Sequence, residues 1–190
     1  MAQPKATQKT HYHAVQFYRD DDSLIRVVAN FLAEGFARGE PGIIVPAAGH
    51  RRAMEEALEA RGLDVKRLMH FGDLVVLDAH ETLDNLIVDG MPHPGVFAHL
   101  AGKLLDETAR IHPGRAIRAW GEMVDLLWKS RRAAAALRLE NMWNDIAKLY
   151  DLKLLCGYSI YNVYRDATAG EITRLHSHLI VDNGEAATIN

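Results

Sequence analysis

Hydrophobic positions along the chain follow two periods, one typical of buried strands and one typical of amphipathic helices. Short, nearly continuous apolar runs occur at residues 13–18, 42–47, 74–78, 116–121 and 154–161. Runs of this length that are rich in β-branched and aromatic residues are typical of strands covered on both faces. The pattern therefore predicts at least five buried strands.

Between these runs, apolar residues recur at every third or fourth position, which is the pattern of a helix with one buried face. Such stretches occur at residues 24–39, 51–62, 94–111 and 139–149. Strands that alternate with helices favour parallel pairing through right-handed crossovers. We therefore expect an α/β fold, a three-layer sandwich with a mostly parallel central sheet.

The chain has 190 residues, a length that suits one domain. Residues 1–10 show no apolar periodicity, so we expect a disordered N-terminal tail there. The expected domain spans residues 11–182, and residues 183–190 form a C-terminal tail. The segment 176–181 (HSHLIV) allows either a last short strand or a docked segment.

Composition excludes several classes of protein. Hydrophobic residues make up 48% and charged residues 25%, which is the balance of a folded globular chain. The net charge of −3 gives no positive excess for nucleic acid to bind. No run approaches the roughly 18 apolar residues of a membrane span, and the start lacks the apolar core of a secretory signal. A single cysteine, Cys156, cannot form an internal disulfide. We expect a cytoplasmic protein without direct nucleic-acid or membrane contact.

The carboxyl ends of the strands are the expected place for a ligand, because open α/β sheets bind ligands beyond that edge. Glu122, which follows a buried strand and the aromatic Trp120, needs a polar partner there. For His13 and Trp120, packing in the core is an equally simple interpretation. The candidate ligand-binding residues are those near this edge, with support from the long helix: His13, Tyr18, Arg19, Trp120, Glu122, Tyr158, Glu140 and Asn144.

The turn after the first strand is where a nucleotide-binding α/β protein carries its glycine-rich phosphate loop. Residues 18–23 read YRDDDS, with no glycine, no lysine and three carboxylates where a triphosphate would lie. Repulsion between these charges disfavours ATP. We expect the acidic residues to cap the following helix.

Histidines form two close pairs, His11 with His13 and His176 with His178. A spacing of two puts both imidazoles on one side of a strand, and four imidazoles are enough to hold a metal ion. Without paired cysteines or a helical HExxH motif, this spacing is weak evidence. No serine or cysteine has an evident base beside it. We therefore expect no metal site, no cofactor and no enzymatic activity.

Six motifs together resemble the MEDS family, the methanogen/methylotroph DcmR sensory domain. They are HAVQFY (13–18), FLAEGFARGE (31–40), RAWGEM (118–123), LENMWN (139–144), LCGY (155–158) and HSH (176–178). The resemblance extends over residues 11–182. It implies a bacterial or archaeal sensory domain that is similar to RecA-like ATPases of the circadian-clock type but has no functional phosphate loop. Such domains are commonly joined to a helix-turn-helix, a histidine kinase or an anti-sigma-factor kinase domain, and are thought to perceive small organic molecules.

The expected function is therefore that of a stand-alone sensory module, which binds a small organic ligand at the carboxyl edge of the sheet. It would relay its state to a signalling protein, such as a kinase or a transcription regulator, or to a second copy of itself. Two alternatives stay open. An altered nucleotide-binding protein or ATPase would use Glu122 to activate water and Asp78 to hold magnesium. A non-catalytic interaction module would use the same motifs for its core and a dimer face.

Overall fold

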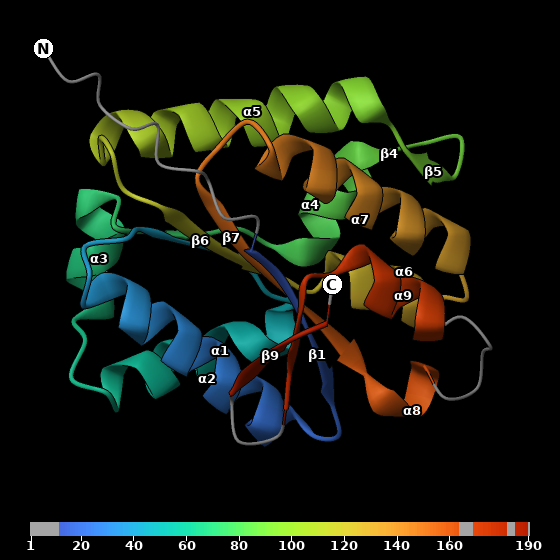
Figure 1. Cartoon of the computed structure of the whole chain (residues 1–190). Helices are drawn as coiled ribbons and strands as arrows, with labels where there is room; N and C mark the ends of the chain where they lie inside the picture. Colours follow the sequence, from blue (N-terminus) through green and yellow to red (C-terminus); the bar gives the residue numbers. More distant parts are fainter. Residues whose placement is uncertain (1–11, 164–168, 182–184, 190) are drawn as a thin grey trace, which may run out of the picture.

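A seven-stranded sheet runs through the middle of the molecule (Figure 1). The computed structural model describes residues 12–163, 169–181 and 185–189. The strand order is β3-β2-β6-β7-β1-β8-β9, and all neighbours are parallel except β8 and β9. The strands of this sheet are β1 (Tyr12–Tyr18), β2 (Gly42–Val45), β3 (Leu74–Val76), β6 (Ile117–Gly121), β7 (Leu152–Ser159), β8 (His178–Ile180) and β9 (Ala186–Thr188). The predicted α/β class with a mostly parallel central sheet is confirmed.

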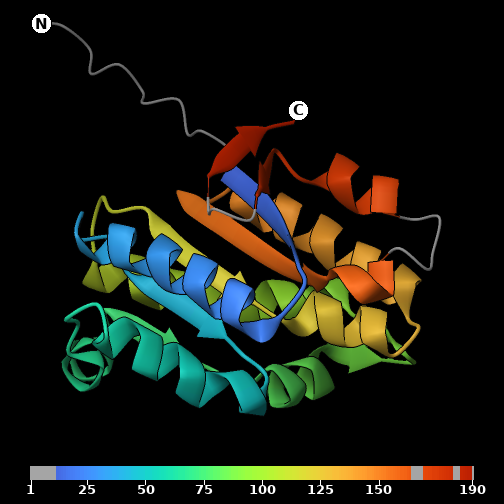
Figure 2. The same ribbon diagram turned by 90° about the horizontal axis from the view of Figure 1, so that it is seen from below.

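Helices cover both faces of the sheet. One face carries α1 (Asp21–Phe36), α2 (Ala48–Glu59) and α3 (Val65–Phe71), and Figure 2 shows α1 and α2 side by side. The other face carries α4 (Ala79–Leu86), α5 (Pro94–Ile111), α6 (Met123–Lys129) and α7 (Ala133–Ala147). A small hairpin of β4 (Ile87–Val88) and β5 (Met91–Pro92) precedes α5, and α8 (Ile160–Val163) and α9 (Ala169–Leu175) follow β7.

The alternation of side chains along the central strands creates two separate cores. Along β7, Leu154 and Cys156 belong to the core on the α7 side, whereas Leu155 belongs to the core on the α1 side. The parallel register places Ala14 of β1 opposite Leu155 and Val15 opposite Cys156. Odd-numbered residues of β1 and even-numbered residues of β7 therefore line the same face.

Several boundaries differ from those that the sequence predicts. The strand expected at residues 154–161 begins two residues earlier and ends at Ser159, because the chain turns into α8 there. The segment 176–181 contains β8, which pairs with β1. Residues 186–188, expected in a tail, form β9 and pair with β8. The expected N-terminal tail, residues 1–10, lies outside the described residues. Across the described part of the chain, no helix is long and apolar enough to cross a membrane.

Candidate functional site

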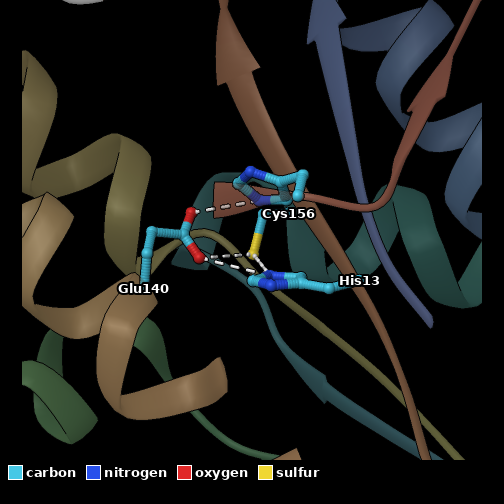
Figure 3. Close-up of side chains that lie close together, drawn as sticks. His13, Glu140 and Cys156 are labelled. Carbon is cyan, nitrogen blue, oxygen red and sulfur yellow. Dashed lines mark hydrogen bonds and ion pairs between the residues drawn. The ribbon is translucent and has the colours of Figure 1, made fainter. Parts of the chain in front are cut away.

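A group of polar side chains is buried between the sheet and α7 (Figure 3). We call it the buried cluster; it consists of His13 of β1, Glu140 of α7, Cys156 of β7 and His176, which follows α9. His13 and Glu140 are 0% exposed, His176 is 1% exposed and Cys156 is 5% exposed. Burial of this much polar and ionisable surface costs stability unless every group has a partner.

Two features bring these four residues together: the register between β1 and β7, and the return of the chain beside β1 after α9. His13 and Cys156 lie on adjacent strands and point to the same face. Glu140 is one of the buried residues of α7, which also include the apolar Leu139 and Ile146. His176 is held by Ser177, whose amide donates to the His13 carbonyl at 2.8 Å, while the His13 amide donates to the Ser177 hydroxyl at 2.9 Å.

The reactive atoms of the buried cluster converge on one small volume. His13 Nε2 lies 3.3 Å from Glu140 Oε2 and 3.3 Å from Cys156 Sγ. Cys156 Sγ lies 3.4 Å from the same carboxylate oxygen, and a dashed line marks this contact in Figure 3. His176 Nε2 lies 3.5 Å from Glu140 Oε1. All four ligand atoms lie within 4.8 Å of one another, so this set of residues could hold either shared protons or a metal ion.

A second layer of contacts orients the rings and the carboxylate. His13 Nδ1 lies 2.9 Å from Asn144 Oδ1, and Asn144 Nδ2 donates to the Leu175 carbonyl at 2.9 Å. Because that carbonyl only accepts, the amide oxygen must face His13, and His13 Nδ1 must carry a proton. His176 Nδ1 likewise donates to a carbonyl, that of Ile172, at 2.7 Å. Both rings therefore direct Nε2 into the buried cluster.

Burial and charge act in opposite directions on the ionisable groups of the buried cluster. Burial alone would raise the pKa of Glu140, but the imidazoles of His176 and His13 outweigh it and hold this pKa below the ordinary value. Burial alone would lower the pKa of His176, but the Glu140 carboxylate outweighs it and raises that pKa. Burial, and then the Glu140 charge, raise the pKa of both Cys156 and Tyr158. The Tyr158 hydroxyl donates to Glu140 Oε1 at 2.7 Å. The arrangement keeps a carboxylate charged deep in the core.

A different polar network occupies the carboxyl edge of the sheet around Glu122. Glu122 is buried, as expected from the sequence, and its Oε2 accepts from the Ala47 amide at 2.7 Å. Its Oε1 lies 2.7 Å from His50 Nδ1, and His50 Nε2 lies 3.3 Å from Asp21. The hydrogen bond to Glu122, together with the charges of Glu122 and Asp21, outweighs burial and raises the pKa of His50 to about 9. This network fastens α2 to β6.

Tyr18 belongs to a third network at the same edge. Its hydroxyl donates to Asp125 Oδ2 at 2.7 Å, and Asp125 is fully buried. The Ser159 amide and the Lys129 ammonium complete the partners of this carboxylate, at 3.0 Å and 2.7 Å. Burial, followed by the Asp125 charge, raises the pKa of Tyr18. Asp125 thus fixes the ends of β1 and β7 against α6.

An apolar cavity of about 80 Å³ lies between the sheet and the helices α4, α5 and α7. Its walls include Phe97 and Ala101 of α5, Trp143 of α7 and Ala119 of β6. Cys156, a member of the buried cluster, also lines this cavity. The cavity and the buried cluster therefore share one side chain.

The structure separates the eight predicted site residues. His13, Glu140, Asn144 and Tyr158 meet beneath α7, on a face of the sheet instead of at its carboxyl edge.

The remaining four do not join them. Tyr18 and Glu122 lie at the edge in two distinct networks. Trp120 is 1% exposed and packs in the core on the α1 side, and Arg19 is exposed. The eight residues thus do not form one site.

Four functional candidates were not among the predicted site residues: His50, Asp125, Cys156 and His176. The single cysteine and the close histidine pair were visible signals, but each is consistent with plain core packing. Each of the two histidine pairs contributes one residue to the buried cluster. The second residue of one pair, His178, packs against the Tyr12 ring with centroids 4.4 Å apart, and that of the other, His11, lies outside the described residues. No local spacing indicates that His13 and His176 meet.

The acidic turn after β1 caps α1, as the sequence predicts. Asp20 accepts a hydrogen bond from the Ser23 amide at 2.7 Å. Asp78, a magnesium ligand in the nucleotide-dependent alternative, instead caps α4 and accepts from the His80 and Glu81 amides at 2.9 Å each. Helix capping accounts for both carboxylates.

Comparison with known proteins gives a family and a fold. A solved structure, that of an uncharacterised protein from Pyrococcus horikoshii in complex with an unknown peptide, has a TM-score of 0.62 and 13% sequence identity. The similarity covers 95% of this chain and 84% of that one, and at this identity it shows a shared fold. No match was found among curated proteins. Residues 12–177 match the family model described as MEDS, the methanogen/methylotroph, DcmR sensory domain. The chain therefore belongs to the MEDS family of sensory domains.

Proposed function

We propose that this domain senses a small, uncharged and largely apolar organic molecule, which binds in the cavity between the sheet and α5. The presence of the ligand is relayed through the buried cluster to a partner protein. The observation that carries this proposal is the position of Cys156, which lines the cavity and contacts both Glu140 and His13. The proposed ligand site is therefore on a face of the sheet instead of at its carboxyl edge.

The chemistry of the cavity favours a narrow class of ligands. Its lining is almost entirely hydrocarbon, and charged groups there would have no partner. A volume of about 80 Å³ suits a molecule of a few heavy atoms. Burial of apolar surface contributes about 25 cal/mol per Å², so such a molecule binds weakly and fast unless it fills the cavity well. This is the behaviour expected of a sensor that follows changing concentrations.

The relay runs from the cavity to the outer surface of α7 and α9. A ligand that displaces the Cys156 sulfur changes its contacts with Glu140, which is carried by α7. One turn further along α7, Asn144 contacts both His13 and the carbonyl of Leu175, the last residue of α9. A ligand that binds one arrangement of these contacts better than another shifts their populations. A kinase or a transcription regulator that binds this surface would respond to the shift.

A non-catalytic role agrees with the engagement of the carboxylates at the strand ends. The two carboxylates that a nucleotide hydrolase would use are Glu122, which is held by the Ala47 amide and His50, and Asp78, which caps a helix. We therefore propose a binding module instead of an ATPase.

The proposal is tested by titrating the protein with straight-chain alcohols of increasing length and with xenon, while the alanine methyl resonances are followed by NMR. We expect saturable shifts at Ala101 and Ala119, with affinity that rises with chain length until the cavity is full. Ala101→Leu should abolish them because the larger side chain occupies the cavity. The control Ala98→Leu, at an exposed position of the same helix, should bind as the wild type does. Equal binding by both variants, or no saturation in the wild type, would refute the cavity as the ligand site.

A further inference from the structure

The geometry of the buried cluster points to a metal site that shares Cys156 with the wall of the proposed ligand cavity. We infer that His13, Glu140, Cys156 and His176 bind one divalent transition-metal ion of the zinc class in tetrahedral coordination. Two imidazoles, one thiolate and one carboxylate form a donor set that zinc accepts in proteins. This inference goes beyond the proposed function and differs from the sequence-based expectation of no metal site.

Three of the distances between the ligand atoms agree with edges of a tetrahedron around zinc. Zinc lies about 2.0–2.1 Å from nitrogen and oxygen and about 2.3 Å from sulfur, which puts neighbouring ligand atoms about 3.3–3.6 Å apart. His13 Nε2 lies 3.3 Å from Glu140 Oε2 and 3.3 Å from Cys156 Sγ. The sulfur lies 3.4 Å from Glu140 Oε2, and His176 Nε2 lies 3.5 Å from Glu140 Oε1. The three distances among His13 Nε2, Glu140 Oε2 and Cys156 Sγ fit a shared ion. His176 approaches the other carboxylate oxygen and would complete the tetrahedron by a small shift, since all four ligand atoms lie within 4.8 Å of one another.

The hydrogen-bonding pattern indicates which atoms are ready to bind the ion. Each ring uses its Nδ1 proton outside the buried cluster, His13 toward Asn144 and His176 toward the Ile172 carbonyl. In a neutral imidazole this leaves a lone pair on Nε2, and both lone pairs then point toward the Glu140 carboxylate. Without a metal ion, shared protons hold these electron-rich atoms together, as where the Cys156 thiol donates to Glu140 Oε2. A metal ion would take the place of those protons, with both imidazoles neutral and Cys156 as a thiolate whose proton is released to solvent.

The outer contacts of the buried cluster are those that support metal ligands in other proteins. A ligating histidine usually donates its other ring proton to an amide or carbonyl oxygen, and a ligating carboxylate is itself hydrogen-bonded. Here Asn144 and the Ile172 carbonyl perform the first role, and the Tyr158 hydroxyl performs the second at 2.7 Å from Glu140 Oε1. His13, His176 and Glu140 thus each have a hydrogen-bonding partner that fixes the orientation of the side chain.

The four ligands come from four separate segments of the chain, which gives the ion a structural consequence. β1, α7, β7 and the residues after α9 would be joined at one point. The last of these segments lies between residues 164–168 and 182–184, which are outside the described part of the chain. Metal binding is therefore expected to contribute folding energy and to hold His176 against the sheet.

Cobalt substitution tests the inference directly. The full-length protein is stripped with a chelator and titrated with Co²⁺, and its absorption spectrum is recorded. Tetrahedral thiolate coordination produces a sulfur-to-cobalt charge-transfer band and intense visible bands. Since Cys156 is the one cysteine in the sequence, that band reports this residue alone. We expect saturation at one equivalent, displacement by Zn²⁺, and a rise of several degrees in the melting temperature on adding Zn²⁺ to the stripped protein.

Variants separate the buried cluster from surface histidines. Cys156→Ser should lose the charge-transfer band. His176→Gln should weaken cobalt binding by at least about tenfold, because loss of even a hydrogen-bonding partner of a ligand costs that much. His178→Gln, two residues along the same segment, should leave both unchanged. A wild-type titration with no thiolate band, or a spectrum and melting temperature that do not respond to stripping and reloading, would overturn the inference and leave shared protons as the charge that holds the cluster. These readouts involve no organic ligand, so their failure would leave the cavity proposal standing.

Discussion

Glu140 is the residue on which the buried cluster depends. It contacts His13, Cys156, Tyr158 and His176, and it is completely buried. A carboxylate in such a place is tolerated only because each oxygen has partners that outweigh the loss of water. Removing its charge leaves those partners without the group that they were arranged around.

We predict that Glu140→Gln lowers the free energy of unfolding by about 3 kcal/mol, which is the loss expected when one member of a buried ion pair is removed. Urea denaturation in the presence of a chelator measures this loss without any contribution from bound metal. Glu107→Gln makes the same chemical change on the exposed face of α5 and should alter stability by less than about 0.5 kcal/mol. Equal stabilities of the two variants would contradict the role assigned to Glu140.

His50 gives a prediction on pH. Its pKa is raised from 6.5 to about 9 by Glu122 and Asp21, so the folded state binds a proton more tightly than the unfolded state does. The stabilisation is fully present below pH 6.5 and is lost as pH rises through about 9. A pKa shift of this size corresponds to about 2–3 kcal/mol of stabilisation, because the side chain is only 16% exposed and solvent screens its ion pairs little.

The measurement is the difference in unfolding free energy between wild type and His50→Gln as a function of pH. We expect this difference to shrink between pH 6.5 and about 9, while His80→Gln, an exposed histidine, shows no such trend. A difference that stays constant over this range would mean that His50 is not protonated by its contact with Glu122.

At the scale of single residues, the sequence indicated several side chains of the buried cluster but not which side chains they contact. Four of the eight predicted site residues, His13, Glu140, Asn144 and Tyr158, meet in the structure. Cys156 could not be placed in the site from the sequence, because one cysteine without a pair carries no spacing. His176 reaches His13 across 163 positions of sequence, and only the return of the chain beside β1 brings the two together.

At the scale of elements, buried strands and long helices were predictable because each carries a strong periodic signal. The strands β1, β2, β3, β6 and β7 all coincide with apolar runs. β8 lies in the segment 176–181 that allowed a short strand, but its three residues carry too weak a pattern to decide. The edge strand β9 also has three residues, all of them exposed, so no apolar alternation marks it. The short helices α3 and α4 were not predicted, because seven or eight residues contain few repeats of the helical period.

The packing of α1 against β6 depends on the absence of a side chain at Gly35. A Cβ atom there would lie 2.6 Å from Cδ of Arg118, whose guanidinium is held by Glu40 and the Phe31 carbonyl. We predict that Gly35→Ala destabilises the protein by about 1–3 kcal/mol through overpacking, despite the higher helix propensity of alanine.

Gly49 of α2 provides the matched control for that substitution. It is exposed, and a Cβ atom would meet nothing within 4 Å. Gly49→Ala should therefore be neutral or stabilising by up to about 1 kcal/mol. Thermal denaturation of the two variants compares them directly, and a stabilised Gly35→Ala protein would show that Arg118 is free to move aside.

At the scale of the whole molecule, the cavity, the buried cluster and the α9 segment form one connected path. The cavity contacts Cys156, the buried cluster contacts Asn144, and Asn144 contacts the Leu175 carbonyl. Sequence patterns gave the α/β fold but not this path, because its contacts join segments that are distant in sequence and its cavity depends on side-chain packing between two layers.

Metal removal should loosen one side of the molecule selectively. We predict that chelation accelerates amide hydrogen exchange in α9 and β8, which are fastened near His176, and leaves β2 and β3 at the other side of the sheet unchanged. Hydrogen exchange followed by mass spectrometry compares the loaded and stripped protein. A uniform change across all strands would argue against a local attachment point.

The central claim is that a ligand in the apolar cavity changes the contacts of the buried cluster. The most direct test is NMR of protein labelled with ¹⁵N-histidine, titrated with an alcohol that saturates the Ala101 methyl resonance, at constant metal content. The account predicts that the ring nitrogens of His13 and His176 shift along the same saturation curve, and that Ala101→Leu abolishes both responses. A cavity that fills while these ring resonances stay unchanged would contradict the claim.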